Sequence, residues 1–283
     1  MEFTKAHGTG NDFVVIADLD ARLDLTPALV RALCDRRTGI GADGVLRVIA
    51  ASSDADAFMD HRNADGSIAE MCGNGVRVVA KYLADHGHVP DRDVLVIDTR
   101  AGLRPVRITR DDEGRAAMMT VDMGPPSFGP EGVDVAVTVE GHALQLTPVS
   151  MGNPHAVVVV DDVDAAPVTT LGPAIASLER FPEGTNVEFV AVGSPHEVHV
   201  RVWERGVGET AACGTGACAA TVALRHLGLV RDRVHVYLPG GALEVAYAPS
   251  EHDSVFLTGP AVEVARGRLD AQWLASAQRG ERG

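Results

Sequence analysis

Short apolar runs bounded by turn residues recur along the first half of the chain, with longer stretches of helical spacing between them. The runs predicted as β-strands cover 14–16, 45–49, 57–61, 94–98, 104–109 and 116–121. One helix is predicted over 26–37, where Thr26 is the N-cap and Pro27 takes the first helical position. A second helix is predicted over 73–86, and Gly87 is its expected C-cap.

The second half of the chain repeats this alternation. Its predicted strands cover 135–139, 144–146, 157–160, 187–192, 198–203, 234–238, 243–246, 255–257 and 262–265, the first two as a hairpin. Helices are predicted over 172–178 and over 214–227, where Gly228 is the expected cap. The tail over 278–283 is expected to fray. Many strands beside one long helix in each half predict an α+β fold.

A duplicated Cys-Gly-x-Gly motif marks the start of both long helices. The copies are Met71-Cys72-Gly73-Asn74-Gly75 and Ala212-Cys213-Gly214-Thr215-Gly216, which lie 141 residues apart in a chain of 283. Further matches keep nearly the same offset, as with Gly10-Asn11 and Gly152-Asn153. Chance similarity of glycine-rich turns is the alternative, but several matches in one register argue for duplication.

The duplication predicts two similar domains in tandem. The first covers 1–121, with 262–275 as a candidate addition, and the second covers 122–261. Gly124-Pro125-Pro126 marks the boundary, because glycine and proline interrupt regular structure.

Composition and charge exclude several classes of protein. The chain is 46% hydrophobic and 23% charged, which suits packed cores and argues against disorder. Its net charge of −14 makes it a poor binder of nucleic acid, which needs Lys and Arg to neutralise phosphates. No apolar run approaches the ~20 residues that cross a bilayer, and residues 1–7 lack the apolar core of a signal peptide. Four cysteines are too few for a disulfide scaffold, so a cytoplasmic protein is expected.

The two motif cysteines have the placement of acid–base groups. A thiol at a helix N-terminus gains from the helix dipole, which favours its thiolate. The amides of the residues that follow form a cradle for an anion such as a carboxylate. One thiolate could therefore remove an α-proton while a thiol returns one to the opposite face, without any cofactor. Cys34 and Cys218 are expected in the core, and the cysteines lack the spacing of a zinc site.

These motifs identify a family, because the chain resembles diaminopimelate epimerases over nearly its whole length. The resemblance rests on both cysteine motifs together with His7-Gly8-Thr9-Gly10-Asn11-Asp12-Phe13, Gly39-Ile40-Gly41-Ala42-Asp43-Gly44, Asn63-Ala64-Asp65-Gly66-Ser67, Gly152-Asn153-Pro154-His155, Gly184-Thr185-Asn186-Val187-Glu188 and Glu204-Arg205-Gly206-Val207-Gly208-Glu209-Thr210. It implies two pseudo-symmetric domains, each a curved, mostly antiparallel sheet around a central helix, with the active site in the cleft between them. It also implies a homodimer.

The implied activity is cofactor-independent interconversion of LL- and meso-2,6-diaminopimelate, in lysine and peptidoglycan precursor synthesis. Cys72 and Cys213 would be the catalytic pair, and His155 and Glu204 would tune their protonation. The residues implied to bind substrate are Asn11, Asn63, Gly73, Asn74, Asn153, Asn186, Glu204, Arg205, Gly214 and Thr215. Arg205 in particular offers a bidentate fork for the distal carboxylate, although a surface ion pair is its plainer interpretation.

One position departs from the family pattern, and other functions compete. Some members carry glutamine where this chain has Gly44, while the matching position in the second half is Asn186. A two-cysteine racemase of another amino acid, of the proline racemase type, would share the same logic. A thiol redox or metal-binding protein would instead work through a disulfide or metal between the cysteines. A noncatalytic anion-binding module would keep its function without either thiol.

Overall fold

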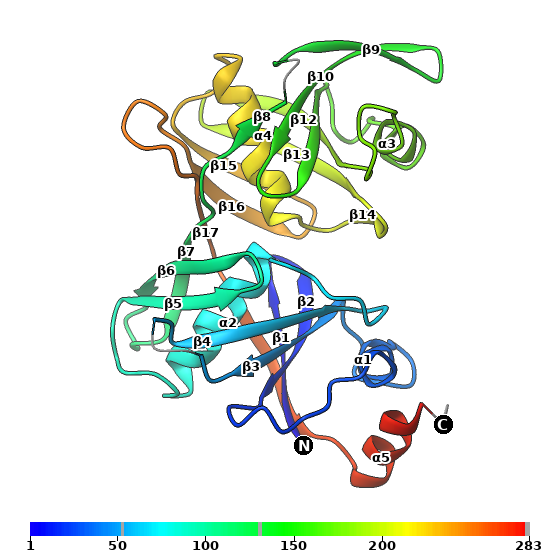
Figure 1. Ribbon diagram of the computed structural model, residues 1–283. Coiled ribbons are helices and arrows are strands. Elements are labelled where there is room, and N and C mark those ends of the chain that lie inside the picture. The colour runs from blue at the N-terminus through cyan, green and yellow to red at the C-terminus, as the bar shows by residue number, and fades with distance from the viewer. Residues whose placement is uncertain (52–53, 130–131, 281–283) are drawn as a thin grey trace. The chain divides into compact units, whose positions relative to one another are not determined.

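The computed structural model describes residues 1–51, 54–129 and 132–280, which form two compact units (Figure 1). Unit 1 comprises Met1–Val121 together with Pro260–Gly283, and unit 2 comprises Asp122–Gly259. Both are mixed α/β, with mostly antiparallel strands and few helices. Within the described ranges, no helix is long and apolar enough to span a membrane.

Unit 1 combines an eight-stranded arrangement with three helices among its described residues. Its strands are β1 (Glu2–Gly8), β2 (Asn11–Ala17), β3 (Gly44–Ile49), β4 (Ala57–Asn63), β5 (Val94–Thr99), β6 (Gly102–Arg110), β7 (Ala116–Asp122) and β18 (Val262–Arg268). Its helices are α1 (Pro27–Cys34), α2 (Gly73–Asp85) and α5 (Ala271–Arg279).

Unit 2 is built in the same manner around two helices, α3 (Val168–Ala176) and α4 (Gly214–His226). Its strands are β8 (Ser127–Phe128), β9 (Val135–Val139), β10 (His142–Ser150), β11 (Pro154–Val159), β12 (Asn186–Ser194), β13 (Glu197–Glu204), β14 (Gly208–Thr210), β15 (Arg233–Leu238), β16 (Gly241–Ala246) and β17 (Phe256–Gly259).

The order and direction of strand pairing are the same in both units. In unit 1 the pairs β1·β2, β3·β4, β5·β6 and β6·β7 are antiparallel, and β2·β3 and β4·β5 are parallel. In unit 2 the pairs β10·β11, β12·β13, β15·β16 and β16·β17 are antiparallel, and β11·β12 and β13·β15 are parallel. Even the register agrees, since Phe13 pairs with Gly44 and His155 with Asn186 at the matching places. The sequence duplication thus corresponds to a repeated topology.

Each unit carries one buried 13-residue helix, α2 in unit 1 and α4 in unit 2. In both, the cysteine of the motif is the N-cap residue. Both also end in a Schellman motif. The amide of His88 donates to Leu83 O across Gly87, and the amide of Leu229 donates to Leu224 O across Gly228. The two glycines take positive φ, which costs them little because they lack a Cβ.

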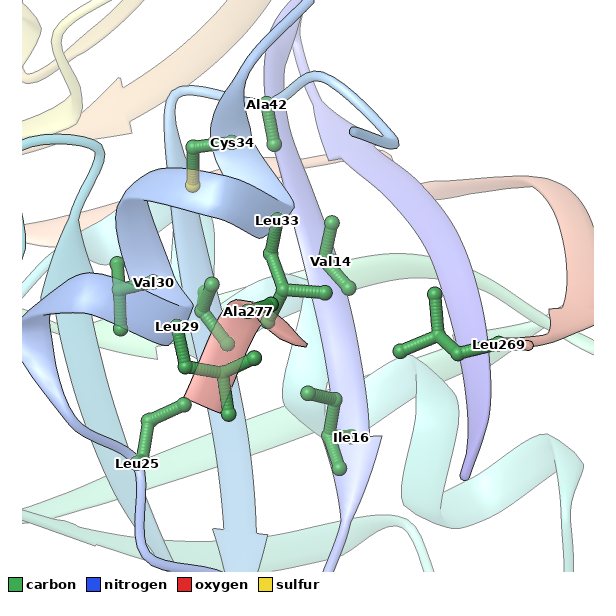
Figure 2. Close-up of a cluster of buried hydrophobic side chains, with 11 residues drawn as sticks. Val14, Ile16, Leu25, Leu29, Val30, Leu33, Cys34, Ala42, Leu269 and Ala277 are labelled. Carbon is green, nitrogen blue, oxygen red and sulfur yellow. The ribbon is translucent and has the colours of Figure 1, made fainter. Parts of the chain in front are cut away.

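The other face of the unit 1 sheet is covered by α1 and α5. Leu29 and Leu33 of α1 meet Val14 and Ile16 of β2 in one apolar cluster, to which α5 adds Ala277 (Figure 2). Alternation along β2 directs Val14 and Ile16 to this cluster and leaves Phe13 for the α2 side. Unit 2 has a corresponding cluster around α3, which includes Phe189 and Trp203.

Several predicted elements differ from those found. Helix α1 ends at Cys34, because Asp35 turns to extended backbone and its carboxylate accepts the amides of Arg37 and Thr38. Helix α3 covers Val168–Ala176 and holds Pro173 inside it, so the predicted start at 172 is wrong. The sequence patterns missed β1, β8, β14 and α5. Helix α5 continues to Arg279 within the tail expected to fray, and residues 281–283 lie outside the described ranges.

Candidate active site

Cys72 sits where the chain enters α2. Its backbone is extended, and its Sγ accepts the amide of Gly75 at 3.4 Å, as an N-cap side chain does. The thiol also reaches Asn11 Oδ1 at 3.7 Å. Gly73 and Asn74, which occupy the first turn, are buried. The dipole and amides of α2 therefore act at this sulfur, as the motif predicts.

Asn11 is oriented by neighbours on both sides. Its Oδ1 accepts from Asn74 Nδ2 at 3.2 Å, and its Nδ2 donates to Asp43 Oδ2 at 2.9 Å. Asp43 in turn forms an ion pair with Arg36 at 2.8 Å, and Arg36 makes two hydrogen bonds to Asp12. This ion-pair network fixes the turn region that carries Asn11 beside α2.

Asp12 ties this network to the stability of unit 1. Burial raises the pKa of its carboxyl, but hydrogen bonds and charges from Arg36 and Lys5 outweigh burial and hold that pKa well below its usual 3.8. The folded state therefore favours the ionised form. The stability that Asp12 contributes is fully present above pH 4 and is lost as the pH falls below it.

We expect Asp12→Asn to lower the free energy of unfolding by about 1–2 kcal/mol at neutral pH, the range for charged hydrogen bonds that are partly exposed. Urea denaturation from pH 3 to pH 8 tests this. The difference between the two proteins should be constant above pH 5 and should shrink towards pH 3. A difference that persists unchanged at pH 3 would contradict this assignment.

Asn63 and Gly44 face each other on neighbouring strands, and they bear on the departure at position 44. Asn63 Nδ2 donates to Ser67 Oγ at 3.0 Å. A Cβ built at Gly44 would lie 2.6 Å from Arg62 O and 3.1 Å from His61 Nε2, so no side chain fits there unless its neighbours move. His61 is buried, and burial lowers its pKa to about 4, which leaves it neutral near pH 7. The sequence patterns did not single out His61.

Cys213 takes the matching position at the start of α4, but its surroundings differ. Sγ accepts the Gly216 amide at 3.4 Å and lies 3.4 Å from Thr215 Oγ1. The Glu204 carboxylate accepts hydrogen bonds from this thiol and from Thr210 Oγ1. Burial, followed by the charges of Glu204 and Glu188, raises the pKa of Cys213 well above its usual value. Burial also raises the pKa of Glu204, against those two hydrogen bonds.

A buried pair stands behind Cys213. His155 Nδ1 lies 2.7 Å from Glu188 Oε1, and neither side chain is exposed to solvent. His155 Nε2 faces Asn153 Oδ1 at 3.1 Å, and Asn153 Nδ2 donates to Thr215 Oγ1 at 3.4 Å. Both ring nitrogens therefore face oxygen acceptors, which suits an imidazolium that donates twice. The chain of contacts runs from Glu188 to the Cys213 thiol.

Asn186 and Arg205 contact each other in unit 2. The Arg205 amide donates to Asn186 Oδ1 at 2.8 Å, and its guanidinium donates to Glu183 O at 2.8 Å. The Arg205 side chain remains exposed, so its guanidinium can reach a ligand.

The predicted site residues are thus distributed between the two units. In unit 1, contacts join Asn11 and Asn74 to Cys72, and Asn63 lies on the strand beside Gly44. In unit 2, Thr215, Asn153, His155 and Glu204 connect to Cys213, while Asn186 and Arg205 make a separate contact. Asp43, His61, Glu188 and Thr210 were not singled out from the sequence. An acid such as Glu188 inside an apolar strand pattern is the signal that could have found one of them.

The fold belongs to a class shared by known racemases and epimerases. A probable proline racemase from Agrobacterium radiobacter matches with a TM-score of 0.72 at 19% identity, covering 95% of this chain and 93% of that one. A hydroxyproline epimerase from Agrobacterium vitis matches with a TM-score of 0.73 at 18% identity, covering 96% and 93%. A PhzF-family phenazine biosynthesis protein from Bacillus anthracis matches with a TM-score of 0.74 at 17% identity, covering 95% and 99%.

Sequence comparison narrows the class to one family. The diaminopimelate epimerase profile matches residues 3–129 and 147–264. Diaminopimelate epimerases from Thioalkalivibrio sulfidiphilus and Alkalilimnicola ehrlichii are 45% and 47% identical, and the matches cover 95% of this chain and 99% and 98% of theirs. The Streptomyces coelicolor enzyme is 45% identical, over 96% of each chain. The chain belongs to the diaminopimelate epimerase family.

Proposed function

We propose that the protein interconverts LL- and meso-2,6-diaminopimelate by passing protons at one α-carbon between Cys72 and Cys213. The single observation that carries this mechanism is the repeated one: each unit places a cysteine at the N-cap of a buried helix. Membership of the diaminopimelate epimerase family supports the substrate. In the proposal, the two units are the two halves of the enzyme, and the active site lies in a cleft between them.

The first turns of α2 and α4 would hold the reacting carboxylate. Gly73, Asn74, Gly214 and Thr215 supply the amides, and helix N-termini favour anions. Removal of the α-proton moves the C–H electron pair into the carboxylate, which becomes an enediolate. Donors aimed at those oxygens stabilise this charge more than the ground state, so they accelerate the reaction.

Cys72 is the better base and Cys213 the better acid in the resting protein. The raised pKa of Cys213 keeps its proton in place, because burial and two nearby carboxylates oppose a thiolate. The Cys72 thiolate would take the α-proton and become a thiol. The Cys213 thiol would give its proton to the opposite face of the carbon and become a thiolate. The reverse reaction exchanges these roles.

His155 and Glu204 would tune the acid through the contacts described above. Glu204 accepts from the Cys213 thiol directly, and His155 acts through Asn153 and Thr215. The distal head of the substrate carries a carboxylate and an ammonium group. The exposed Arg205 suits the carboxylate, and the residues assigned to the remaining contacts are Asn11, Asn63, Asn153, Asn186 and Glu204.

Two further expectations belong to this proposal. The thiols must stay free to react, so a reducing compartment such as the cytoplasm is the setting in which we expect the reaction. The family resemblance implies a homodimer, which light scattering of the purified protein would test.

Incubation in deuterated water with LL-diaminopimelate tests the proposed reaction. Deuterium should enter the α-carbon as the optical configuration changes, with no cofactor added. Proline serves as the control substrate and should show no exchange, because it lacks a second amino-acid head. Exchange into proline but not into diaminopimelate would favour the other two-cysteine racemases.

A further inference from the structure

The two units place buried polar side chains at different positions of their common topology. In unit 2 the strands beside α4 carry His155 and Glu188, whereas the matching strand positions of unit 1, 142 residues earlier, carry Phe13 and Leu46. Phe13 and Leu46 are fully buried. Leu46 even makes the equivalent approach, since it lies nearest to a Cβ built at Gly75, as Glu188 does at Gly216.

The helices show the reverse pattern. Arg77 of α2 is fully buried, and the matching position of α4, 141 residues later, is Cys218. Thr9, which contacts Arg77, corresponds to Met151, again a small change of place but a polar residue replaced by an apolar one. Unit 1 therefore buries a cation near its cysteine, where unit 2 buries carboxylates.

Arg77 holds the segment around Cys72 through two printed contacts with neutral acceptors. Its Nη2 donates to Asn74 Oδ1 at 2.5 Å and to Thr9 Oγ1 at 3.2 Å. Thr9 and Gly10 form the turn between β1 and β2, and both take positive φ. A threonine adopts that conformation only where its surroundings hold it. Gly8 leaves the necessary room, because a Cβ there would lie 3.0 Å from Asn74 O and 3.3 Å from Arg77 Nη2.

The Asn74 contact connects Arg77 to the sulfur. With its Oδ1 bound to Arg77, the Asn74 side chain must direct Nδ2 outward, and Nδ2 donates to Asn11 Oδ1 at 3.2 Å. The same Asn11 oxygen lies 3.7 Å from Cys72 Sγ. A guanidinium stays protonated throughout the working range of a protein, so the positive charge behind the α2 N-terminus is permanent.

We propose that Arg77 is a positioning residue that makes the two thiols unequal, by orienting Asn74 and by stabilising negative charge at the N-terminus of α2. It thereby favours the thiolate of Cys72, while Glu204 and Glu188 favour the thiol of Cys213. The inference rests on the proposed function for its meaning, but the inequality is a property of the resting protein. A full charge in a buried setting outweighs the dipole of one amide such as that of Asn11.

Other charged groups around α2 are paired or distant from Cys72. The groups on α2 and on the strands packed against it that share its side of the sheet are Lys81, Asp85, His86, His61 of β4, Arg104 and Arg110 of β6, and Glu263 of β18. Lys81 binds Asp85, and His86 binds Glu263, about two and a half turns or more along the helix. His61 is neutral near pH 7. Asp43 reaches Asn11 from its far side and is paired with Arg36.

Alkylation of the resting protein by iodoacetamide tests this inference. The rate at each cysteine is followed from pH 5 to pH 10 by mass spectrometry of the peptides. The midpoint of each profile reports the thiolate, whereas the absolute rate also depends on access. In the wild type, Cys72 should have the lower midpoint. Arg77→Met should raise that midpoint by about one pH unit, which slows alkylation about tenfold near pH 7, and leave the Cys213 midpoint unchanged.

Two matched variants separate charge from hydrogen bonding. Arg77→Lys keeps the charge and should stay within a few tenths of a pH unit of the wild type. Arg77→Gln keeps a hydrogen-bond donor without the charge and should shift as Arg77→Met does. A folded neutral variant with the wild-type Cys72 midpoint overturns the inference, and so does a lysine variant that shifts as far as methionine. If neither neutral variant folds, a wild-type Cys72 midpoint above that of Cys213 overturns it.

The outcome is independent of turnover. A protein with no epimerase activity but an Arg77-dependent Cys72 midpoint would refute the proposed function and keep this inference. An active epimerase whose midpoints ignore Arg77 would do the opposite.

Discussion

Replacing either Cys72 or Cys213 by alanine should lower kcat for epimerisation by at least about 10³-fold, with little change in binding of diaminopimelate. Each thiol is the base in one direction and the acid in the other, so one substitution blocks both directions. General acid–base groups contribute about 10²–10⁴-fold each, and here no second group can take over. Circular dichroism of the optical change, together with solvent deuterium uptake, measures the loss from both stereoisomers.

The other two cysteines provide the control. Cys34 is buried, and burial raises its pKa to about 12, so it is unsuited to proton transfer. Cys34→Ala should keep kcat within about twofold of the wild type, as expected of a residue outside the site. Normal epimerisation by a folded Cys72→Ala or Cys213→Ala protein would rule out the two-thiol mechanism. Such a result would leave a noncatalytic anion-binding role for the helix termini.

Substituting His155 by phenylalanine should lower the free energy of unfolding of unit 2 by about 3–5 kcal/mol. The change strands Glu188 as a buried carboxylate without its partner, and breaking a buried pair in this way has that cost. The second substitution is suggested by the chain itself, because Phe13 and Leu46 occupy the matching positions of unit 1. The double variant with His155→Phe and Glu188→Leu should recover most of the lost stability while activity stays low.

Fluorescence during urea denaturation can follow unit 2 alone. The chain has two tryptophans, and Trp203 packs in the apolar cluster of unit 2 while Trp273 packs in that of unit 1. A Trp273→Phe background therefore leaves Trp203 as the reporter, which avoids treating two units as one transition. If the double variant is no more stable than the single one, the loss comes from packing and the ion pair is not its cause.

Local signals made the centre of each unit predictable. A cysteine before Gly-x-Gly defines the N-cap, and a glycine at the far end defines the stop, so α2 and α4 were found almost to the residue. Repetition of the motif also indicated two similar halves. Strand β1 was missed because its buried positions hold the small residues Thr4, Ala6 and Gly8, which give no apolar alternation. Helix α5 was missed because few large side chains mark its buried face.

Long-range contacts explain what the motifs could not predict. Glu188 and His155 are 33 residues apart, and only the parallel register of β11 and β12 brings that strand pair together. Arg77 looks like an ordinary surface residue in a helical pattern, and its burial follows from strands on several sides of α2. The local environment that distinguishes one thiol from the other is therefore a property of tertiary structure.

Strand β18 has a consequence for how the polypeptide is made. It belongs to unit 1 and pairs with β1, although the whole of unit 2 lies between them in the sequence. Domains emerging from the ribosome usually mature in order from the N-terminus. Here the intervening unit is complete first, and the opening strand waits for its outer neighbour until translation is nearly over. A truncated chain that stops before residue 262 should therefore leave β1 as an exposed sheet edge, open to association with other chains.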